Sequence, residues 1–211
     1  MMIARTIAAL LVSLIVAMPL ATRAAEGDTP FDDRYTRYCF NCHAADPSGF
    51  PYPRYVPPKI AGQDAAYVLA AILGYREGTR NHWLMNSPAE MLPSEVIPGL
   101  AAYISNLDGA ELPSYAAGAP NERTVSRGAA VAEGMCFKCH GTAARMSKKG
   151  IPNLDGQYAS YLLAAMREYR LGVRNHKRMY EITAGLSLED SAAVAAYYAS
   201  LAGLFPLAKS E

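Results

Sequence analysis

The four cysteines of this 211-residue chain stand in two copies of one pattern. Cys39 and Cys42 are separated by two residues and followed at once by His43, and Cys136, Cys139 and His140 repeat the arrangement 97 residues later. In a CxxCH motif the two thiols can add to the two vinyl groups of haem, and the histidine can then reach the iron. One helical turn places both sulfurs on one edge of the porphyrin. The sequence therefore predicts two covalently attached haem c groups.

Three other uses of paired cysteines compete with this interpretation. A four-cysteine zinc site gives no reason for a histidine after both pairs, and its usual spacing is far shorter. Structural disulfides would close loops of only two residues, which contribute little stability. A thioredoxin-type redox pair is expected near a βαβ pattern, which the sequence lacks. Covalent haem attachment is therefore the prediction that we carry forward.

An internal repeat organises the elements that must position these motifs. When the chain is shifted by 94 residues, Pro58–Leu107 aligns without a gap on Pro152–Leu201, and 21 of the 50 positions are identical. The identities include Gly62-Gln63 with Gly156-Gln157 and Arg80-Asn81-His82 with Arg174-Asn175-His176. Repeats of this length are longer than solenoid units and indicate two small domains that arose by duplication. We place the domains at residues 25–112 and 122–211, with a linker at 113–121 inside a segment rich in Gly, Ala, Pro and Ser.

The periodicity within each repeat is helical, so the predicted fold is all-α. Val68, Ala71, Ile72 and Tyr75 fall at i, i+3, i+4 and i+7, as do their repeat partners from Leu162 to Tyr169. Ser187 followed by Asp190 is a capping box that opens an apolar helix running to about Leu201. Its first-half counterpart is expected to begin later, because Pro98 stands in its first turn. Short helices over 34–38 and 127–134 are expected to lead into the cysteine motifs.

The first 24 residues have the features of a secretory signal peptide. A positive charge precedes an apolar run from Ile7 to Leu20, and Thr22-Arg23-Ala24 offers small residues for cleavage after Ala24. The alternative is an uncleaved membrane anchor, but this run is shorter than the roughly 20 residues that span a bilayer. We therefore expect a periplasmic protein.

The net charge of +1 conceals two domains of opposite sign. Residues 25–112 contain 6 Lys+Arg and 11 Asp+Glu, whereas residues 113–211 contain 12 and 8. The near-even total argues against a nucleic-acid binder that relies on positive charge. Lys138, Lys148 and Lys149 lie in or near the second cysteine motif, where a basic rim could steer an acidic redox partner. The alternative is an ordinary solvated surface.

The ordered motifs of both halves resemble class I cytochrome c domains, and their tandem arrangement resembles the dihaem cytochrome c4 family. The resemblance rests on the two CFxCH motifs, the IPNLDGQ turn from Ile151 to Gln157, the spacing from Arg174 to Met179 and the final Ala-Ala-Tyr-Tyr helix. It covers essentially the whole chain after residue 24. It implies two compact helical haem domains in an exported electron-transfer protein.

The resemblance also implies the second axial ligand of each iron. Met85 and Met179 are equivalent in the repeat and occupy the position of the family's distal methionine. His82 and His176, each three residues earlier, are the rival ligands, and we favour a structural role for both. The family's proline carbonyl, which holds the axial histidine, corresponds to Pro152 and to Pro58. Arg80 and Arg174 are candidates to neutralise haem propionates, the alternative being exposed arginines at a helix end.

Two classes of function follow from these expectations. In the first, the protein passes single electrons between redox partners, towards a terminal oxidase or reductase that is membrane-bound. In the second, it is the electron-accepting subunit of a dehydrogenase complex, such as one for sulfide or thiosulfate. With His43, Met85, His140 and Met179 on the irons, no position is open for a small substrate, so the chain itself is not an enzyme. A dihaem peroxidase would need such an open position, which counts against that third interpretation.

Overall fold

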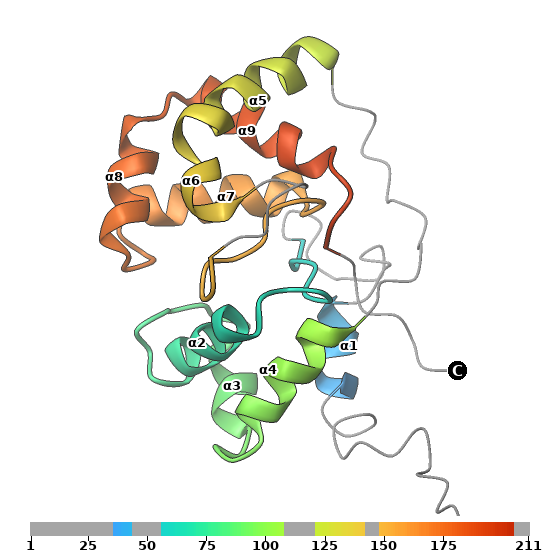
Figure 1. Ribbon diagram of the computed structural model, residues 1–211. Coiled ribbons are helices and arrows are strands. Elements are labelled where there is room, and N and C mark those ends of the chain that lie inside the picture. The colour runs from blue at the N-terminus through green and yellow to red at the C-terminus, as the bar shows by residue number, and fades with distance from the viewer. Residues whose placement is uncertain (1–35, 44–55, 108–120, 142–147, 205–211) are drawn as a thin grey trace, which may run out of the picture.

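The computed structural model describes residues 36–43, 56–107, 121–141 and 148–204, and every regular element within these ranges is a helix (Figure 1). The predicted all-α architecture is confirmed. The elements of the first half are α1 (Thr36–His43), α2 (Ala65–Arg76), α3 (Asn86–Met91) and α4 (Ile97–Asn106). Those of the second half are α5 (Glu122–Met135), α6 (Phe137–His140), α7 (Ala159–Arg170), α8 (Lys177–Gly185) and α9 (Leu188–Ala199).

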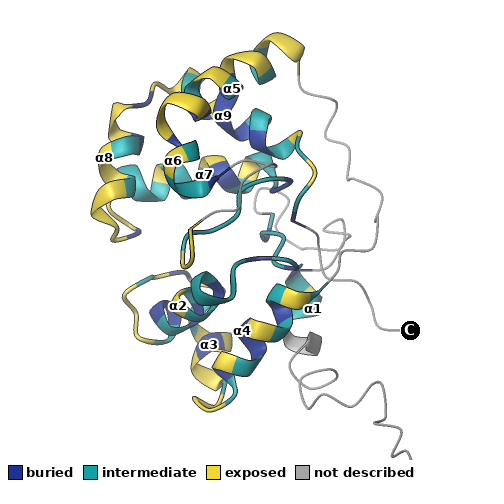
Figure 2. Ribbon diagram, in the orientation of Figure 1, coloured by how far each residue is buried: buried dark blue, intermediate teal, exposed yellow. Residues whose placement is uncertain are grey.

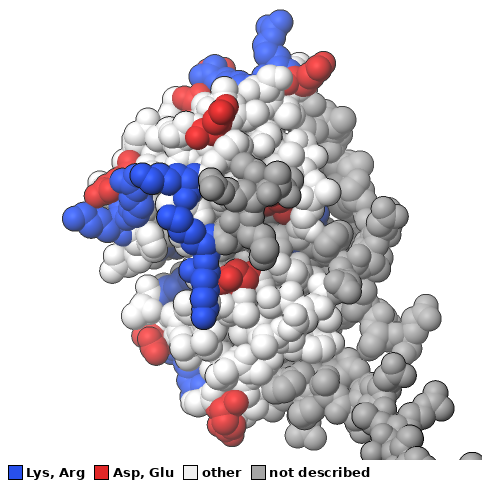
Figure 3. Space-filling view, viewed as in Figure 1, with Lys and Arg blue, Asp and Glu red and all other residues white. Residues whose placement is uncertain are grey.

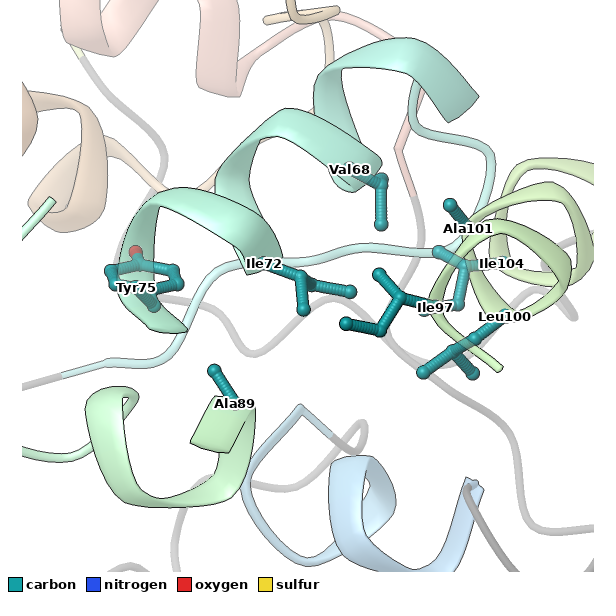
Figure 4. Close-up of a cluster of buried hydrophobic side chains, with 8 residues drawn as sticks. All are labelled: Val68, Ile72, Tyr75, Ala89, Ile97, Leu100, Ala101 and Ile104. Carbon is teal, nitrogen blue, oxygen red and sulfur yellow. The ribbon is translucent and has the colours of Figure 1, made fainter. Parts of the chain in front are cut away.

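The core of the N-terminal domain lies between α2, α3 and α4 (Figure 4). Val68, Ile72 and Tyr75 recur on one side of α2 at the predicted helical spacing and are all buried. They meet Ala89 from α3, and Ile97 and its neighbours from α4. Burial of this apolar side therefore fixes α2 against the two helices that follow it.

The final helix of each domain begins as the sequence predicts. Ser187 is the N-cap of α9: its hydroxyl accepts a hydrogen bond from the Asp190 amide at 2.9 Å and donates one to the Asp190 carboxylate at 2.7 Å. In the first half α4 begins at Ile97 with Pro98 in its first turn. Under the 94-residue shift this start lies three residues later than that of α9, because proline is tolerated only in the first turn of a helix.

The C-terminal domain is built on a close crossing of α5 and α9. Gly128 lies at the contact, where an added Cβ would come within 2.0 Å of the Ala193 carbonyl oxygen. The helix expected over 127–134 is longer than predicted, since α5 begins at Glu122 with Asn121 as its N-cap. The Asn121 side chain accepts a hydrogen bond from the Arg123 amide at 2.9 Å. Core residues from α5, α7 and α9 meet beneath this crossing, among them Ala132, Leu162 and Val194.

Several expectations fall on residues that the structure does not describe. The signal peptide lies wholly within residues 1–35, which are outside the described ranges. So are residues 113–120 of the expected linker, and only its last residue, Asn121, is described. The first two residues of the helix expected over 34–38 are also outside the described ranges, and α1 continues through His43. The domain boundaries and the cleavage site stay predictions. Among the described helices, none has the length and apolar content to cross a membrane.

Candidate haem-binding site

The two CxxCH motifs are held on short helices that bring each histidine under a proline carbonyl. α1 contains Cys39, Cys42 and His43, and α6 follows Cys136 and ends at His140. The Nδ1 of His43 lies 2.7 Å from the Pro58 carbonyl oxygen. In the second domain the corresponding distance, from His140 to Pro152, is 2.9 Å. This geometry agrees with the prediction that the carbonyls of Pro58 and Pro152 hold the axial histidines.

This contact determines which nitrogen of each histidine is available to a metal. A carbonyl oxygen only accepts, so Nδ1 must carry the proton and donate it, which leaves Nε2 with a free lone pair. Burial lowers the pKa of His43 and of His140, although the hydrogen bond to the proline carbonyl opposes the change. Both rings are therefore neutral at pH 7, as an iron ligand must be.

A single cavity of about 870 Å³ is lined by both motifs and by both candidate methionines. Its walls are mainly apolar side chains from α2, α4, α7 and α9. The four cysteines bordering it form no disulfide with one another. Paired thiols, an imidazole with a free Nε2 and a thioether in an apolar cavity are the groups that haem c requires, so the residues fit this cofactor.

The candidate axial methionines occupy matching positions beside this cavity. Met85 stands immediately before α3 and packs against the N-terminal core, and Met179 lies in the first turn of α8. Both side chains are partly buried. Met91 and Met135 also border the cavity but are 69% and 40% exposed. Ligation of iron by Met85 and Met179 stays a prediction, which this placement supports.

His82 and His176 each accept a hydrogen bond from a nearby backbone amide of their own domain. The Nδ1 of His82 accepts a hydrogen bond from the Leu84 amide at 3.3 Å, and that of His176 accepts one from the Met179 amide at 3.2 Å. His176 is thereby the N-cap of α8. Each ring also meets a tyrosine of the preceding helix edge-on. These contacts support the structural role that we favoured over ligation.

Arg80 and Arg174 meet at the boundary between the domains rather than at an exposed helix end. Their backbones form an isolated antiparallel bridge, and Arg174 is only 6% exposed. The Arg174 guanidinium pairs with Glu168, whereas Arg80 bonds the hydroxyls of Tyr67 and Tyr161 at 3.3 Å each. The alternative of exposed arginines is wrong for both.

One buried donor at this boundary has no hydrogen-bond partner. The Nε of Arg80 is buried without one, and Arg80 lines the cavity as Arg174 does. A buried cationic donor without an acceptor is costly unless a bound group supplies one. Such an atom bordering the cavity fits a cofactor that carries carboxylates.

Two glutamines that sequence reasoning passed over form the symmetric centre of the domain boundary. Gln63 and Gln157, 5% and 3% exposed, each reach into the opposite domain. Gln157 pairs with the backbone of Lys59, and Gln63 pairs with the backbone of Asn153. The identity of the Gly-Gln dipeptide in both repeats was the only signal of their importance.

The residues after the two prolines complete the same symmetric boundary. The Lys59 ammonium donates to the Gly156 carbonyl at 2.7 Å. The side-chain amide of Asn153 donates to the Gly62 carbonyl at 3.2 Å. Both glycines have a positive φ, near 77° and 75°, a conformation that side chains rarely adopt. The repeated turns thus face each other across the boundary.

The structure offers little support for a zinc site. Among the described residues, no group of three or more His, Cys, Asp and Glu side chains gathers closely enough to hold a metal ion. The two cysteine pairs therefore do not combine into one tetrahedral site, which argues against zinc in favour of two separate attachment sites.

Basic side chains collect on the C-terminal domain around its cysteine motif. Figure 3 shows Lys and Arg over the side of the molecule formed by α6, α8 and the loop before α7. Exposed side chains on these segments form what we call the basic surface: Lys138, Lys148, Lys149, Lys177 and Arg178.

The N-terminal domain presents the opposite charge. In residues 56–107 the cations Lys59, Arg76 and Arg80 all make hydrogen bonds to protein groups. Glu77, Glu90 and Glu95 on the same stretch are exposed. Figure 2 shows exposed positions along α3 and in the loop that follows α2. The difference in charge between the halves is therefore a difference between two surfaces.

Comparisons with known proteins agree with this geometry. Residues 125–202 match the family model described as cytochrome c. The chain is 31% identical over 204 residues to cytochrome c4 of Pseudomonas aeruginosa, covering 91% of this chain and 98% of the relative. It is also 31% identical over 174 residues to a thiosulfate dehydrogenase electron acceptor of Stutzerimonas stutzeri, covering 77% and 78%.

A solved structure shows that the likeness extends to the two-domain fold. Cytochrome c4 of Acidithiobacillus ferrooxidans superposes with a TM-score of 0.63 at 25% identity, covering 79% of this chain and 99% of that one. The match to nearly the full length of two cytochromes c4 accounts for both halves, each with its own cysteine motif, histidine and proline carbonyl. The chain belongs to the dihaem cytochrome c4 family.

Proposed function

We propose that this protein carries single electrons between two different redox protein partners, one meeting each domain. A haem bound in each domain would supply one-electron chemistry between the ferrous and ferric states. The observation that carries the proposal is the duplicated arrangement of a CxxCH motif, a carbonyl-held histidine and a partly buried methionine around one cavity. We assign the axial pairs as His43 with Met85 and His140 with Met179.

The residues of each domain divide the work of holding the cofactor. The cysteines of each motif would anchor it covalently, and the proline carbonyl fixes the orientation of the histidine ring. The apolar walls of the cavity would keep water from a bound haem, which would favour methionine ligation and a raised reduction potential. Arg80 and Arg174 supply buried positive charge at the boundary, suited to the propionates of the two haems.

Substitution of the methionines tests the assigned ligands. We expect Met85→Leu to remove methionine coordination from one haem and Met179→Leu to remove it from the other, in each case lowering that haem's reduction potential. The measurement is the electronic spectrum of the oxidised protein, which contains a band specific to methionine bound to ferric haem. Met91→Leu, at the exposed methionine, is the matched control and should leave both haems unchanged. Retention of the full band in Met85→Leu would disprove its role.

The basic surface is suited to an acidic partner. Lys138, Lys148 and Lys149 are exposed on the C-terminal domain, and opposite charges accelerate encounter at low ionic strength. We expect Lys→Glu at all three positions to slow electron exchange with the partner of that domain by about tenfold or more at low salt. Stopped-flow rates of electron entry and exit would be compared with those of Arg123→Glu, an exposed site at the far end of α5. Unchanged entry and exit rates would refute the idea.

A second function is supported by one of the relatives. Since the chain resembles a thiosulfate dehydrogenase electron acceptor over 77% of its length, it could serve a dehydrogenase as a dedicated electron-accepting subunit. Purification of the native protein under mild conditions distinguishes the two functions: a catalytic chain that co-purifies in fixed ratio supports the subunit. Fractionation and sequencing of the mature N-terminus would test export to the periplasm with cleavage after Ala24.

A further inference from the structure

A continuous chain of hydrogen bonds connects each axial histidine to a glutamine of the opposite domain. His43 donates from Nδ1 to the Pro58 carbonyl at 2.7 Å. The amide N–H of the same peptide group belongs to Lys59, and it donates to Oε1 of Gln157 at 2.9 Å. The Nε2 of Gln157 returns a hydrogen bond to the Lys59 carbonyl, also at 2.9 Å. Gln157 therefore makes two hydrogen bonds to the backbone that holds the histidine of the other domain.

The second domain contains the mirror image of this chain. His140 donates to the Pro152 carbonyl at 2.9 Å, and the amide of that peptide group, from Asn153, donates to Oε1 of Gln63 at 2.7 Å. The Nε2 of Gln63 donates to the Asn153 carbonyl at 3.1 Å. Because equivalent positions of the two repeats give the same geometry, the pairing is a property of the repeated fold and not of one loop.

Hydrogen bonds in such a chain strengthen one another. A peptide whose N–H donates to an acceptor becomes more polarised, so its carbonyl oxygen accepts more strongly, by roughly 10–30% per bond. Both glutamines and His43 are less than 9% exposed, so water screens these dipoles little. A stronger acceptor at Nδ1 raises the basicity of the imidazole, which stabilises the ferric haem and lowers its reduction potential.

We propose that Gln63 and Gln157 are crossed positioning residues, each setting the reduction potential of the haem in the opposite domain. Gln157 acts through Lys59 and Pro58 on His43, and Gln63 acts through the equivalent peptide on His140. The inference rests on the proposed function, since it takes His43 and His140 as iron ligands. Its consequence is that a partner that disturbs the domain boundary changes the potential of both haems.

The test compares Gln157→Leu with Gln63→Leu in the full-length dihaem protein. Leucine removes the acceptor, so Gln157→Leu should raise the potential of the N-terminal haem more than that of the C-terminal one, and Gln63→Leu should do the reverse. Redox titration followed by paramagnetically shifted proton resonances resolves the two haems, which Met85→Ala and Met179→Ala assign. Equal shifts in both haems, or a larger shift in the glutamine's own domain, would overturn the proposal.

A conservative variant separates this role from simple packing. Gln157→Glu keeps an accepting oxygen for the Lys59 amide, so the potential of the N-terminal haem should stay at or below the wild-type value. A rise equal to that in Gln157→Leu would mean that boundary packing, not the hydrogen bond, sets the potential.

The proposed ligation is tested separately by a readout that does not use the haem. Hydrogen exchange of the Lys59 amide should quicken at least tenfold in Gln157→Leu, and that of the Asn153 amide should quicken in Gln63→Leu. If each glutamine substitution quickens exchange of the amide in the opposite domain, but the wild-type spectrum lacks the band of methionine coordination, the proposed ligands are refuted and the hydrogen-bond chain is not. Unchanged amide exchange would refute the chain itself.

Discussion

Replacing Gly128 by alanine probes the helix crossing on which the C-terminal haem domain is built. An alanine Cβ at this position would lie 2.0 Å from the Ala193 carbonyl oxygen, 2.5 Å from its carbonyl carbon and 2.8 Å from the Tyr197 Cβ. Carbon and oxygen atoms in close contact ordinarily stay about 3.3–3.6 Å apart. Two of the three obstacles are backbone atoms of α9, so no rotamer change can relieve the overlap and the helices must separate.

The expected loss is the difference between two opposing effects. Alanine favours a helix over glycine by about 0.8–1 kcal/mol, which stabilises the variant. Overpacking at a close contact costs about 1–3 kcal/mol and more where backbone must move, and the separation also loosens Ala132 and Cys136 against Val194. We expect a net loss of about 2 kcal/mol. For a domain of this size each kcal/mol corresponds to about 4–8 °C in melting temperature.

The assay is thermal unfolding of the dihaem protein, followed by haem absorbance and far-ultraviolet circular dichroism. Gly134→Ala is the matched control, because it makes the same substitution in the same helix with nothing within 4 Å of the added Cβ. Only the helix-propensity effect acts there, so Gly134→Ala should stabilise by about 0.5–1 kcal/mol. If Gly128→Ala unfolds at or above the wild-type temperature, the close crossing of α5 and α9 is wrong.

Two further substitutions test contacts that hold the same domain together. Arg170 donates to two backbone carbonyls and one hydroxyl around α8 and α9, so Arg170→Met should cost about 2–3 kcal/mol in denaturant unfolding, whereas the exposed Arg167→Met in the same helix should cost under 0.5 kcal/mol. The Ser187 hydroxyl and then Arg127 lower the pKa of Asp190, so its stabilising effect is present at neutral pH and is lost as the pH falls below about 4, the ordinary range of an unfolded aspartate. Asp190→Asn should therefore flatten the acid side of the stability curve between pH 5 and pH 3; an acid-side slope as steep as that of the wild type would contradict the assignment.

Much of the haem site could be predicted because its signals are local. The CxxCH spacing, the helical periodicity of α2 and α7, and the capping box at Ser187 each depend on residues within a few positions of one another. The equivalence of Met85 and Met179 came from comparing the two halves of one sequence. Such comparison substitutes for long-range information when a domain occurs twice.

The boundary between the domains could not be predicted in the same way. Arg80 read as a helix-end arginine or a propionate partner, and only the folded chain shows it against Tyr67 and Tyr161 of two domains. The roles of Gln63 and Gln157 depend on residues 90 and 98 positions away. The starts of helices are similarly hard to predict: the sequence predicted a helix from residue 127, whereas α5 begins five residues earlier, at Glu122, with Asn121 as its N-cap.

The mirror pairing at the boundary has a consequence for how the two halves can diverge. In a symmetric pair of identical subunits every substitution occurs twice, so a change that suits one redox centre is imposed on the other as well. Joining both halves in one chain removes that constraint. Position 74 of the first repeat is a glycine, whereas the equivalent position 168 is a glutamate that pairs with Arg174. Lys59 and its equivalent Asn153 have different side chains, yet each donates to a glycine carbonyl of the opposite domain. One half can thus acquire its own charge and its own partner while the shared contact is kept.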